Sequence, residues 1–269
     1  LNRTQLSAFV ANLPVCLIGI ESCGGAHHWT RLFTEMGHTV RMMAPQFVKP
    51  YVKSNKNDSA DAEAICEAVQ RPTMRFIPAK SIEQQDIQSL HRIRSQLVAR
   101  RTAQANQIRG LLMEYGIVIP QGISYIRKSL PDILEDGENR LSVLFREQLS
   151  GLYEEMVHLD ERIEVLELSL KTISAQNEDC KRLLTIPGVG LMTATALIAA
   201  VGDVNVFKSG RELAAWLGLV PRQHSTGGKP TLLGISKRGD SYLRTLLIHG
   251  GRAVVRSANK HEDKRSQWV

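Results

Sequence analysis

Cysteines are few in this sequence, and their spacing excludes a structural zinc site. Cys16, Cys23, Cys66 and Cys180 form no CxxC pair and no finger-type pattern, which is typical of thiols in a reducing compartment. No apolar run approaches the roughly 20 residues of a membrane-spanning helix, and no signal peptide precedes the first predicted strand. We therefore expect a cytoplasmic protein with no membrane partner.

Acidic residues are scarce towards both ends of the chain and concentrated in between. Residues 1–130 carry a net charge of +7, residues 131–180 carry −9 and residues 181–269 carry +9. Clustered rather than scattered basic residues are typical of proteins that bind nucleic acid. Because 43% of the 269 residues are hydrophobic, the chain can also bury a core. We expect a globular, DNA-binding protein.

The first part of the chain alternates strand and helix patterns. The segments, in order, are a strand over 13–20, a helix over 26–37, a strand over 38–45 and a helix from 58 to about 71. The first strand is an apolar run that ends at Glu21 and two glycines, as buried parallel strands do. This order indicates an α/β layer over residues 1–80.

Two long helical patterns fill residues 81–180. The first runs from Ile82 to Tyr115 and has a basic face, which we expect to contact nucleic acid through Arg92, Arg94, Arg100 and Arg101. The second has eight apolar residues from Leu149 to Ile173, alternately three and four apart. These are the a and d positions of a heptad repeat. They predict either a helical hairpin within the chain or a coiled coil between chains, and we expect a homo-oligomer, a dimer or a tetramer.

The last part, residues 181–269, begins with the stretch LLTIPGVGLMTATALIAAVG. It predicts a helix, a tight turn with Gly188 and Gly190, and an Ala-rich helix, the pattern of a helix-hairpin-helix unit. Backbone N–H groups in such a turn, with the positive end of the second helix, can bind a phosphate. A plain helical hairpin is the alternative. Further candidates for phosphate contacts, each of which can equally be a solvated side chain, are Lys229, Lys237, Arg238 and Arg244.

Two carboxylates, Asp58 and Asp61, begin the predicted helix in a basic part of the chain. The helix dipole alone favours acidic residues there. Residues three apart share a helical face, however, so both side chains can reach one divalent ion, and Glu21 at a strand end suits a third ligand. Carboxylates that hold Mg²⁺ beside a basic surface indicate phosphodiester chemistry. We predict that Glu21, Asp58 and Asp61 converge on one ion.

Several stretches together resemble one protein family. IGIESCGGAHHW, NKNDSADAEAI and much of the sequence from Lys181 to Val255 are similar to the DEDD-type transposases of the one-ten insertion-sequence family, the bridge-RNA-guided recombinases. The resemblance covers nearly the whole chain. It implies an α/β plus α fold: a partial RuvC-like, RNase-H-type domain, a helical and coiled-coil middle, and a small mostly helical domain that supplies a serine nucleophile.

The resemblance also implies catalytic roles for individual residues. Glu21 matches the family's glutamate, and Asp58 and Asp61 match its closing aspartates, whereas its first aspartate has no match. We therefore expect a chain truncated at both ends. Ser225, in the stretch PRQHSTGGKP, matches the nucleophile, and we expect it on an exposed, poorly ordered loop. Ser236 and Ser241 are the competing serines.

The expected function is to cut and rejoin the DNA of an insertion sequence with Mg²⁺ and Ser225, guided by a structured RNA. A serine alkoxide that attacks a phosphodiester would leave a 5′-phosphoserine link. Two alternatives stay open. One is a RuvC-like nuclease that hydrolyses DNA with metal and water, and the other is an inactive remnant that only binds nucleic acid.

Overall fold

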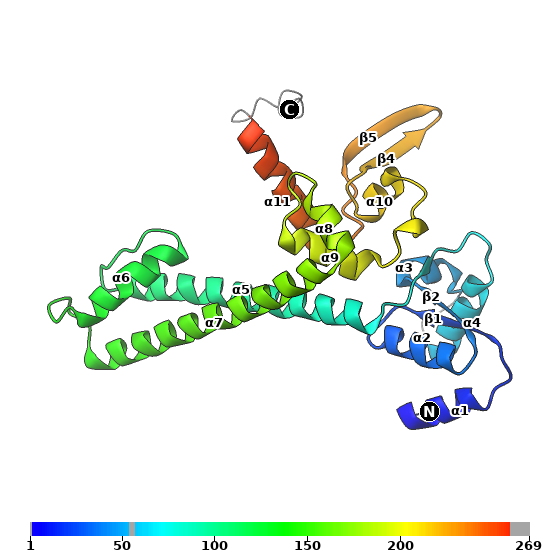
Figure 1. Cartoon of the computed structure of the whole chain (residues 1–269), viewed down its shortest axis with the longest axis horizontal. Coiled ribbons are helices and arrows are strands. Elements are labelled where there is room, and N and C mark those ends of the chain that lie inside the picture. The colour runs from blue at the N-terminus through cyan, green and yellow to red at the C-terminus, as the bar shows by residue number, and fades with distance from the viewer. Residues whose placement is uncertain (1, 54–56, 259–269) are drawn as a thin grey trace. The chain divides into compact units, whose positions relative to one another are not determined.

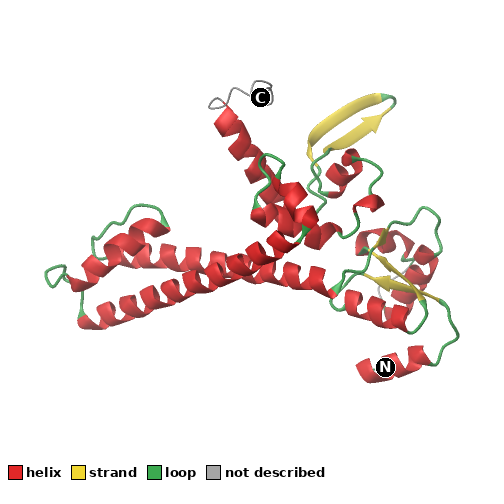
Figure 2. Ribbon diagram, viewed as in Figure 1, coloured by secondary structure: helices red, strands yellow, loops and turns green. Residues whose placement is uncertain are grey.

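The computed structural model describes residues 2–53 and 57–258, which are mostly helical with two small sheets (Figures 1 and 2). The chain divides into two compact units, Leu1–Ile82 and Glu83–Val269. Across the described ranges no helix is both long and apolar enough to span a membrane.

The first unit is a small α/β layer. Its elements are α1 (Arg3–Ala11), β1 (Leu17–Glu21), α2 (Ala26–Glu35), β2 (Thr39–Met43), α3 (Pro45–Val48), the 3-10 helix η1 (Lys49–Tyr51), α4 (Asp58–Val69) and β3 (Phe76–Ile77). β1 and β2 pair in parallel, with Glu21 opposite Met43, and β3 pairs antiparallel with β2. The predicted order of strand, helix, strand and helix is confirmed, because its apolar periodicity is local to each element.

The second unit contains two long helices, α5 (Ile82–Met113) and α7 (Val143–Gln176), which run side by side in opposite directions (Figure 1). The remaining elements are α6 (Ile123–Glu135), α8 (Glu178–Leu184), α9 (Leu191–Val201), the 3-10 helix η2 (Val204–Val206), α10 (Gly210–Trp216), β4 (Pro221–Thr226), β5 (Lys229–Ile235) and α11 (Ser241–Ser257). β4 and β5 form an antiparallel hairpin that is a sheet of its own.

Every seventh residue of α7 packs inside the chain. These residues, which we call the buried seam, are at most 4% exposed: Leu149, Met156, Ile163 and Leu170. At one end of the seam, Leu149 and Met156 join a cluster with Ile108 and Leu112 of α5. At the other end, Leu170 packs with Ile87 of α5. This half of the heptad pattern therefore forms an intrachain helical hairpin, the first of the two interpretations that the sequence allowed.

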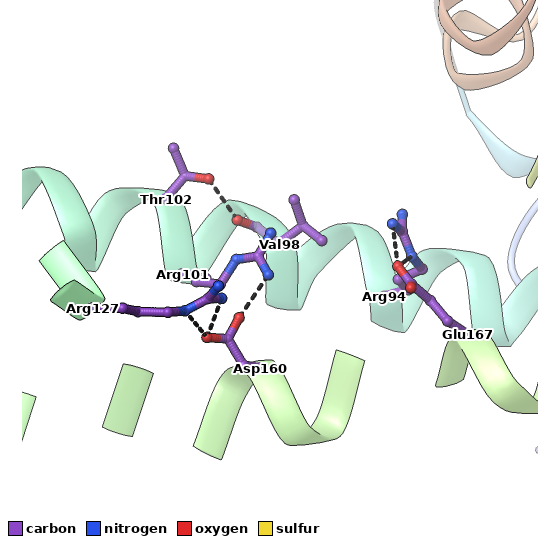
Figure 3. Close-up of polar contacts among 7 residues, drawn as sticks. All are labelled: Arg94, Val98, Arg101, Thr102, Arg127, Asp160 and Glu167. Carbon is purple, nitrogen blue, oxygen red and sulfur yellow. Dashed lines mark hydrogen bonds and ion pairs between the residues drawn. The ribbon is translucent and has the colours of Figure 1, made fainter. Parts of the chain in front are cut away.

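Ion pairs follow the same two helices (Figure 3). Arg94 donates from Nε and Nη2 to Glu167 Oε1 over 2.8 and 2.6 Å, and Arg101 Nη1 donates to Asp160 Oδ1 over 2.7 Å. Arg127 of α6 also binds Asp160. The acidic middle of the sequence thus partly neutralises the basic helix α5.

The turn between α8 and α9 crosses α11 at a contact between two backbones. Gly188 in the turn has a φ of +83°, and a Cβ there would lie 2.8 Å from the carbonyl oxygen of Gly250. A Cβ at Gly250 would lie 1.9 Å from the carbonyl oxygen of Gly188. Two facing glycines are therefore required at this crossing, which holds α11 against the α8–α9 pair.

Gly250→Ala is expected to destabilise the protein by about 1–3 kcal/mol, because the backbones must separate to admit the methyl group. Gly251→Ala is the matched control: it lies next in the same helix, and a Cβ there meets nothing within 4 Å. That change should stabilise by about 0.5–1 kcal/mol through helix propensity. Chemical unfolding monitored by circular dichroism measures the free energy of unfolding of both variants. Equal changes in the two variants would contradict a close backbone contact at Gly250.

Candidate functional site

The three predicted metal-binding acids lie where β1 and α4 face each other. A Cβ at Gly19 of β1 would lie 2.9 Å from Ile65 Cγ2 and 3.1 Å from Val69 Cβ, both on α4. Side chains alternate along a strand, so Glu21 projects from the same face of the sheet as position 19. That face is the one covered by α4.

The spacing within α4 places the two aspartates on its sheet-facing side. Asp61 precedes Ala64 by three residues and Ala68 by seven, and both alanines are fully buried. Residues at these spacings share a helical face, and Asp58 begins the same stripe one turn earlier. Asn57 caps the helix, since its side chain accepts a hydrogen bond from the N–H of Ala60 over 2.8 Å. Neither aspartate is therefore needed as the cap.

The predicted convergence on one ion is not met in this structure. In residues 2–53 and 57–258, no three His, Cys, Asp or Glu side chains gather closely enough to hold a metal ion. Glu21 and Asp61 are half-buried and Asp58 is exposed. Carboxylate oxygens are the ligands that Mg²⁺ takes, so the donor chemistry fits, and the three side chains would have to move together to share an ion.

Ser225 lies on β4, near the tip of the β4–β5 hairpin, and every residue of β4 is exposed. The hairpin turn consists of Gly227 and Gly228, with φ of +56° and +75°. Two residues with positive φ form the turn that matches the twist of a hairpin, and glycine suits both positions. The exposure expected for Ser225 is confirmed, but the expected poorly ordered loop is wrong, because the two glycines close a hairpin in which Ser225 pairs with Pro230.

Gln223 is the partner of Ser225 that sequence reasoning missed. Its Nε2 donates a hydrogen bond to Ser225 Oγ over 2.7 Å, from two residues earlier on the same face of the strand. His224 lies between them and points to the opposite face, where it pairs with Thr231. The i, i+2 spacing within a strand was the signal available in the sequence.

The two competing serines lie away from the hairpin tip. The N–H of Ser236 donates to the carbonyl oxygen of Val220 over 2.8 Å, closing the base of the hairpin. Ser241 is the first residue of α11, directly after Asp240, whose Oδ1 accepts from the N–H of Tyr242 over 2.8 Å. Ser225 differs from both in its position near the tip of the hairpin, on an exposed strand.

The predicted phosphate-binding residues fall into two groups. Lys229, Lys237 and Arg238 are exposed around the hairpin, and Arg92 and Arg100 are exposed on α5. The others have intrachain partners. Arg94 and Arg101 pair with α7, and Arg244 Nη1 donates to the carbonyl oxygens of Leu217 and Gly239 over 3.2 and 3.1 Å. The basic face of α5 is therefore smaller than the sequence indicated.

The glycine-rich turn also has partners inside the chain. Gly188 faces Gly250, and the N–H of Val189 donates to the carbonyl oxygen of Ile186 over 3.0 Å. Gly190 is the N-cap of α9 in an extended conformation. The α8–turn–α9 arrangement is a helical hairpin, and a phosphate-binding role for Gly188 and Gly190 stays a prediction.

His91, another residue that sequence reasoning missed, lies at the centre of a buried polar network. Its Nε2 is 3.0 Å from Thr195 Oγ1 and its Nδ1 is 3.0 Å from Tyr242 Oη. Thr195 donates to the carbonyl oxygen of Leu191 over 2.8 Å, so it accepts from His91 Nε2, and Nδ1 accepts from Tyr242. Burial first, and the charge of Arg94 second, lower the pKa of His91 to about 4. Burial also raises the pKa of Tyr242.

The depressed pKa predicts a loss of stability in acid. The unfolded chain binds a proton at His91 near pH 6.5 and the folded chain near pH 4, so the free energy of unfolding falls as pH drops between these values. The full loss is about 3 kcal/mol. His91→Gln should flatten this part of the pH profile in urea unfolding. His158→Gln, at an exposed histidine of α7, should leave it unchanged, and a profile that His91→Gln does not alter would contradict the assignment.

Comparison with known proteins shows which family this chain belongs to. One family model, described as a transposase, matches residues 3–117, and another, described as the transposase IS116/IS110/IS902 family, matches residues 180–267. The chain is 50% identical over 270 residues to a probable family 20 transposase of Pseudomonas aeruginosa, covering 100% of this chain and 80% of that protein. It belongs to the IS110/IS116 family of insertion-sequence transposases.

Two further relatives support this family membership. The transposase for insertion sequence element IS1111A of Coxiella burnetii is 49% identical, over 99% of this chain and 73% of that protein. The transposase for insertion sequence element IS1328 of Yersinia enterocolitica is 44% identical, over 100% of this chain and 79% of that protein. Transposases catalyse DNA strand transfer, so this is a family of enzymes that act on DNA. The three acids of this transposase lie in the first matched segment and Ser225 lies in the second.

Proposed function

We propose that this transposase cuts and rejoins DNA strands with Ser225 as its nucleophile and with Glu21, Asp58 and Asp61 as ligands of Mg²⁺. The observation that carries the proposal is the setting of Ser225. Its hydroxyl is exposed near a two-glycine turn and is oriented by Gln223, whereas Ser236 lies at the base of the hairpin and Ser241 begins α11.

The chemistry follows from the serine hydroxyl. Ser225 Oγ attacks the phosphorus of a phosphodiester, the bond to the 3′ oxygen breaks, and the 5′ phosphate stays on the serine. Because the ester bond is retained, another 3′ hydroxyl can reverse the step and join a different strand. The amide of Gln223 orients Oγ but cannot remove its proton. His224 lies on the other face, so a base from elsewhere must accept the proton.

The acids supply the second half of the proposed site. A bound divalent ion would polarise the phosphate and stabilise the attacking or leaving oxygen. The parallel β1–β2 pair, with Glu21 at a strand end and the aspartates on the facing stripe of α4, supports a RuvC-like, RNase-H-type domain. We propose three regions: this domain over 1–80, the helical region over 81–180 and the serine-bearing domain, with its helix-hairpin-helix, over 181–269.

We further propose that a structured guide RNA sets the target and that protomers assemble on DNA. The family resemblance and the basic charge of the first and last parts of the chain support nucleic-acid binding at both. Two DNA ends need more than one serine, which favours a homo-oligomer. The second candidate is a RuvC-like nuclease that uses the same acids with water, and it differs in forming no covalent intermediate.

Ser225→Ala is expected to abolish a covalent protein–DNA species formed with donor DNA, guide RNA and Mg²⁺, while leaving DNA binding unchanged. Gln223→Ala should slow its formation by about tenfold, the loss of roughly one hydrogen bond to the nucleophile. His224→Ala, on the opposite face, is the matched control and should form the species at the normal rate. A denaturing gel with labelled DNA measures all three. An adduct that survives Ser225→Ala contradicts the nucleophile.

Glu21→Gln and Asp61→Asn are expected to weaken Mn²⁺ binding and to lower strand cleavage by about two orders of magnitude, because each removes a carboxylate ligand. The control is Glu63→Gln in the same helix, whose carboxylate binds Lys53 over 2.8 Å. Electron paramagnetic resonance follows Mn²⁺ binding, and a gel follows cleavage. If Glu63→Gln weakened Mn²⁺ binding as much as Asp61→Asn, a specific site on the sheet-facing stripe would be ruled out.

A further inference from the structure

Two arginines of α5 differ from the others in being exposed and without an ion pair in the part of the chain that the structure describes. Arg94 and Arg101 bind carboxylates of α7, and Arg109 Nε donates to the carbonyl oxygen of Ile119 over 3.2 Å. Arg92 and Arg100 are exposed and form no ion pair with any described residue. Eight residues separate them, about 12 Å along the helix, so they can bind two phosphates of one strand.

A pocket of about 400 Å³ opens beside Arg92, between α5, α9 and the start of α11. Three small residues of α9 line it: Ala196, Ala199 and Ala200. Gln88 and Gln96 of α5 supply amide groups to its lining, and Tyr242 lines it from α11 beside Asp240, the cap of that helix. The volume lies in the range of about 300–1,000 Å³ that small-molecule sites occupy.

Tyr242 is held in place by the polar network below the pocket. Its hydroxyl is 3.0 Å from Nδ1 of the buried His91, and the two rings pack edge to face with centroids 5.6 Å apart. The tyrosine ring is therefore a fixed wall rather than a mobile cover. Small apolar side chains, a fixed aromatic ring and amides that can both donate and accept suit a planar heterocycle with polar edges.

We propose that this pocket binds one unpaired nucleotide, extruded from a nucleic acid whose backbone lies along Arg92 and Arg100. A base inside a duplex is stacked and paired and cannot enter such a pocket, whereas an unpaired base can stack on the tyrosine and hydrogen-bond to the amides. Arg92, an exposed residue of the pocket lining, binds the attached phosphate. The proposal goes beyond strand cutting, since it needs neither Ser225 nor the three acids.

The test uses the full chain and one pair of variants. Ala99 lines the pocket from α5 and is exposed, so Ala99→Trp fills the space without disturbing the core. Ala103→Trp is the matched control, because Ala103 is exposed one turn further along the same face and lies outside the pocket. Equal thermal unfolding midpoints for the two variants establish that both fold.

Four probes are compared by fluorescence anisotropy: a DNA duplex, the same duplex with one extra unpaired 2-aminopurine, and the two RNA counterparts. The wild-type protein should bind the probe with the unpaired base about tenfold tighter than its duplex. Ala99→Trp should remove this preference and Ala103→Trp should keep it. A preference in the DNA pair alone identifies DNA as the source of the nucleotide, and one in the RNA pair alone identifies RNA. No preference in either pair, or equal behaviour of the two variants, overturns the proposal.

Discussion

The packing of α5 against α7 is the interaction on which the second unit depends. Burying a leucine or methionine side chain contributes about 1.5–3 kcal/mol, whereas a half-exposed ion pair such as Arg94–Glu167 contributes about 0–1 kcal/mol. Each residue of the buried seam therefore contributes more stability than an ion pair does, and the arginine–carboxylate pairs fix which residues of the two helices face each other. α6 packs at one end of the α5–α7 pair. At the other end, Ala199 of α9 packs against Ile87 and Leu170.

Ser225 lies on an exposed hairpin that projects from a firmly packed part of the second unit. The small helical domain is fixed on the long helices by the His91–Tyr242 network, and within that domain the crossing of Gly188 with Gly250 holds α11 against the α8–α9 pair. The β4–β5 hairpin, in contrast, is a two-stranded sheet whose first strand is fully exposed, and such hairpins are marginally stable by themselves. A firmly held base with an exposed tip suits a nucleophile that meets its phosphate only when DNA is bound.

The sequence predicted what depends on local periodicity and missed what depends on distant partners. The strands and helices of the first unit and the heptads of α7 follow apolar spacing within each element. The partners of Arg94 and Arg101 lie more than 50 residues away. The sequence therefore showed a basic helical face but not the carboxylates that pair with it. His91 occupies an apolar position of α5, and only the fold brings Thr195 and Tyr242 to it. The Gly227–Gly228 pair carried a hairpin signal that was interpreted as a loop.

The central claim is that Ser225 becomes covalently attached to DNA. Tandem mass spectrometry of the protein trapped with donor DNA, guide RNA and Mg²⁺, after nuclease digestion, identifies the modified side chain directly. Trypsin does not cut efficiently between Lys229 and Pro230, so Ser225 and Ser236 share one peptide and fragmentation distinguishes them. The account predicts a nucleotide phosphate on Ser225. A phosphate on Ser236 or Ser241, or cleaved DNA with no modified serine, would contradict it.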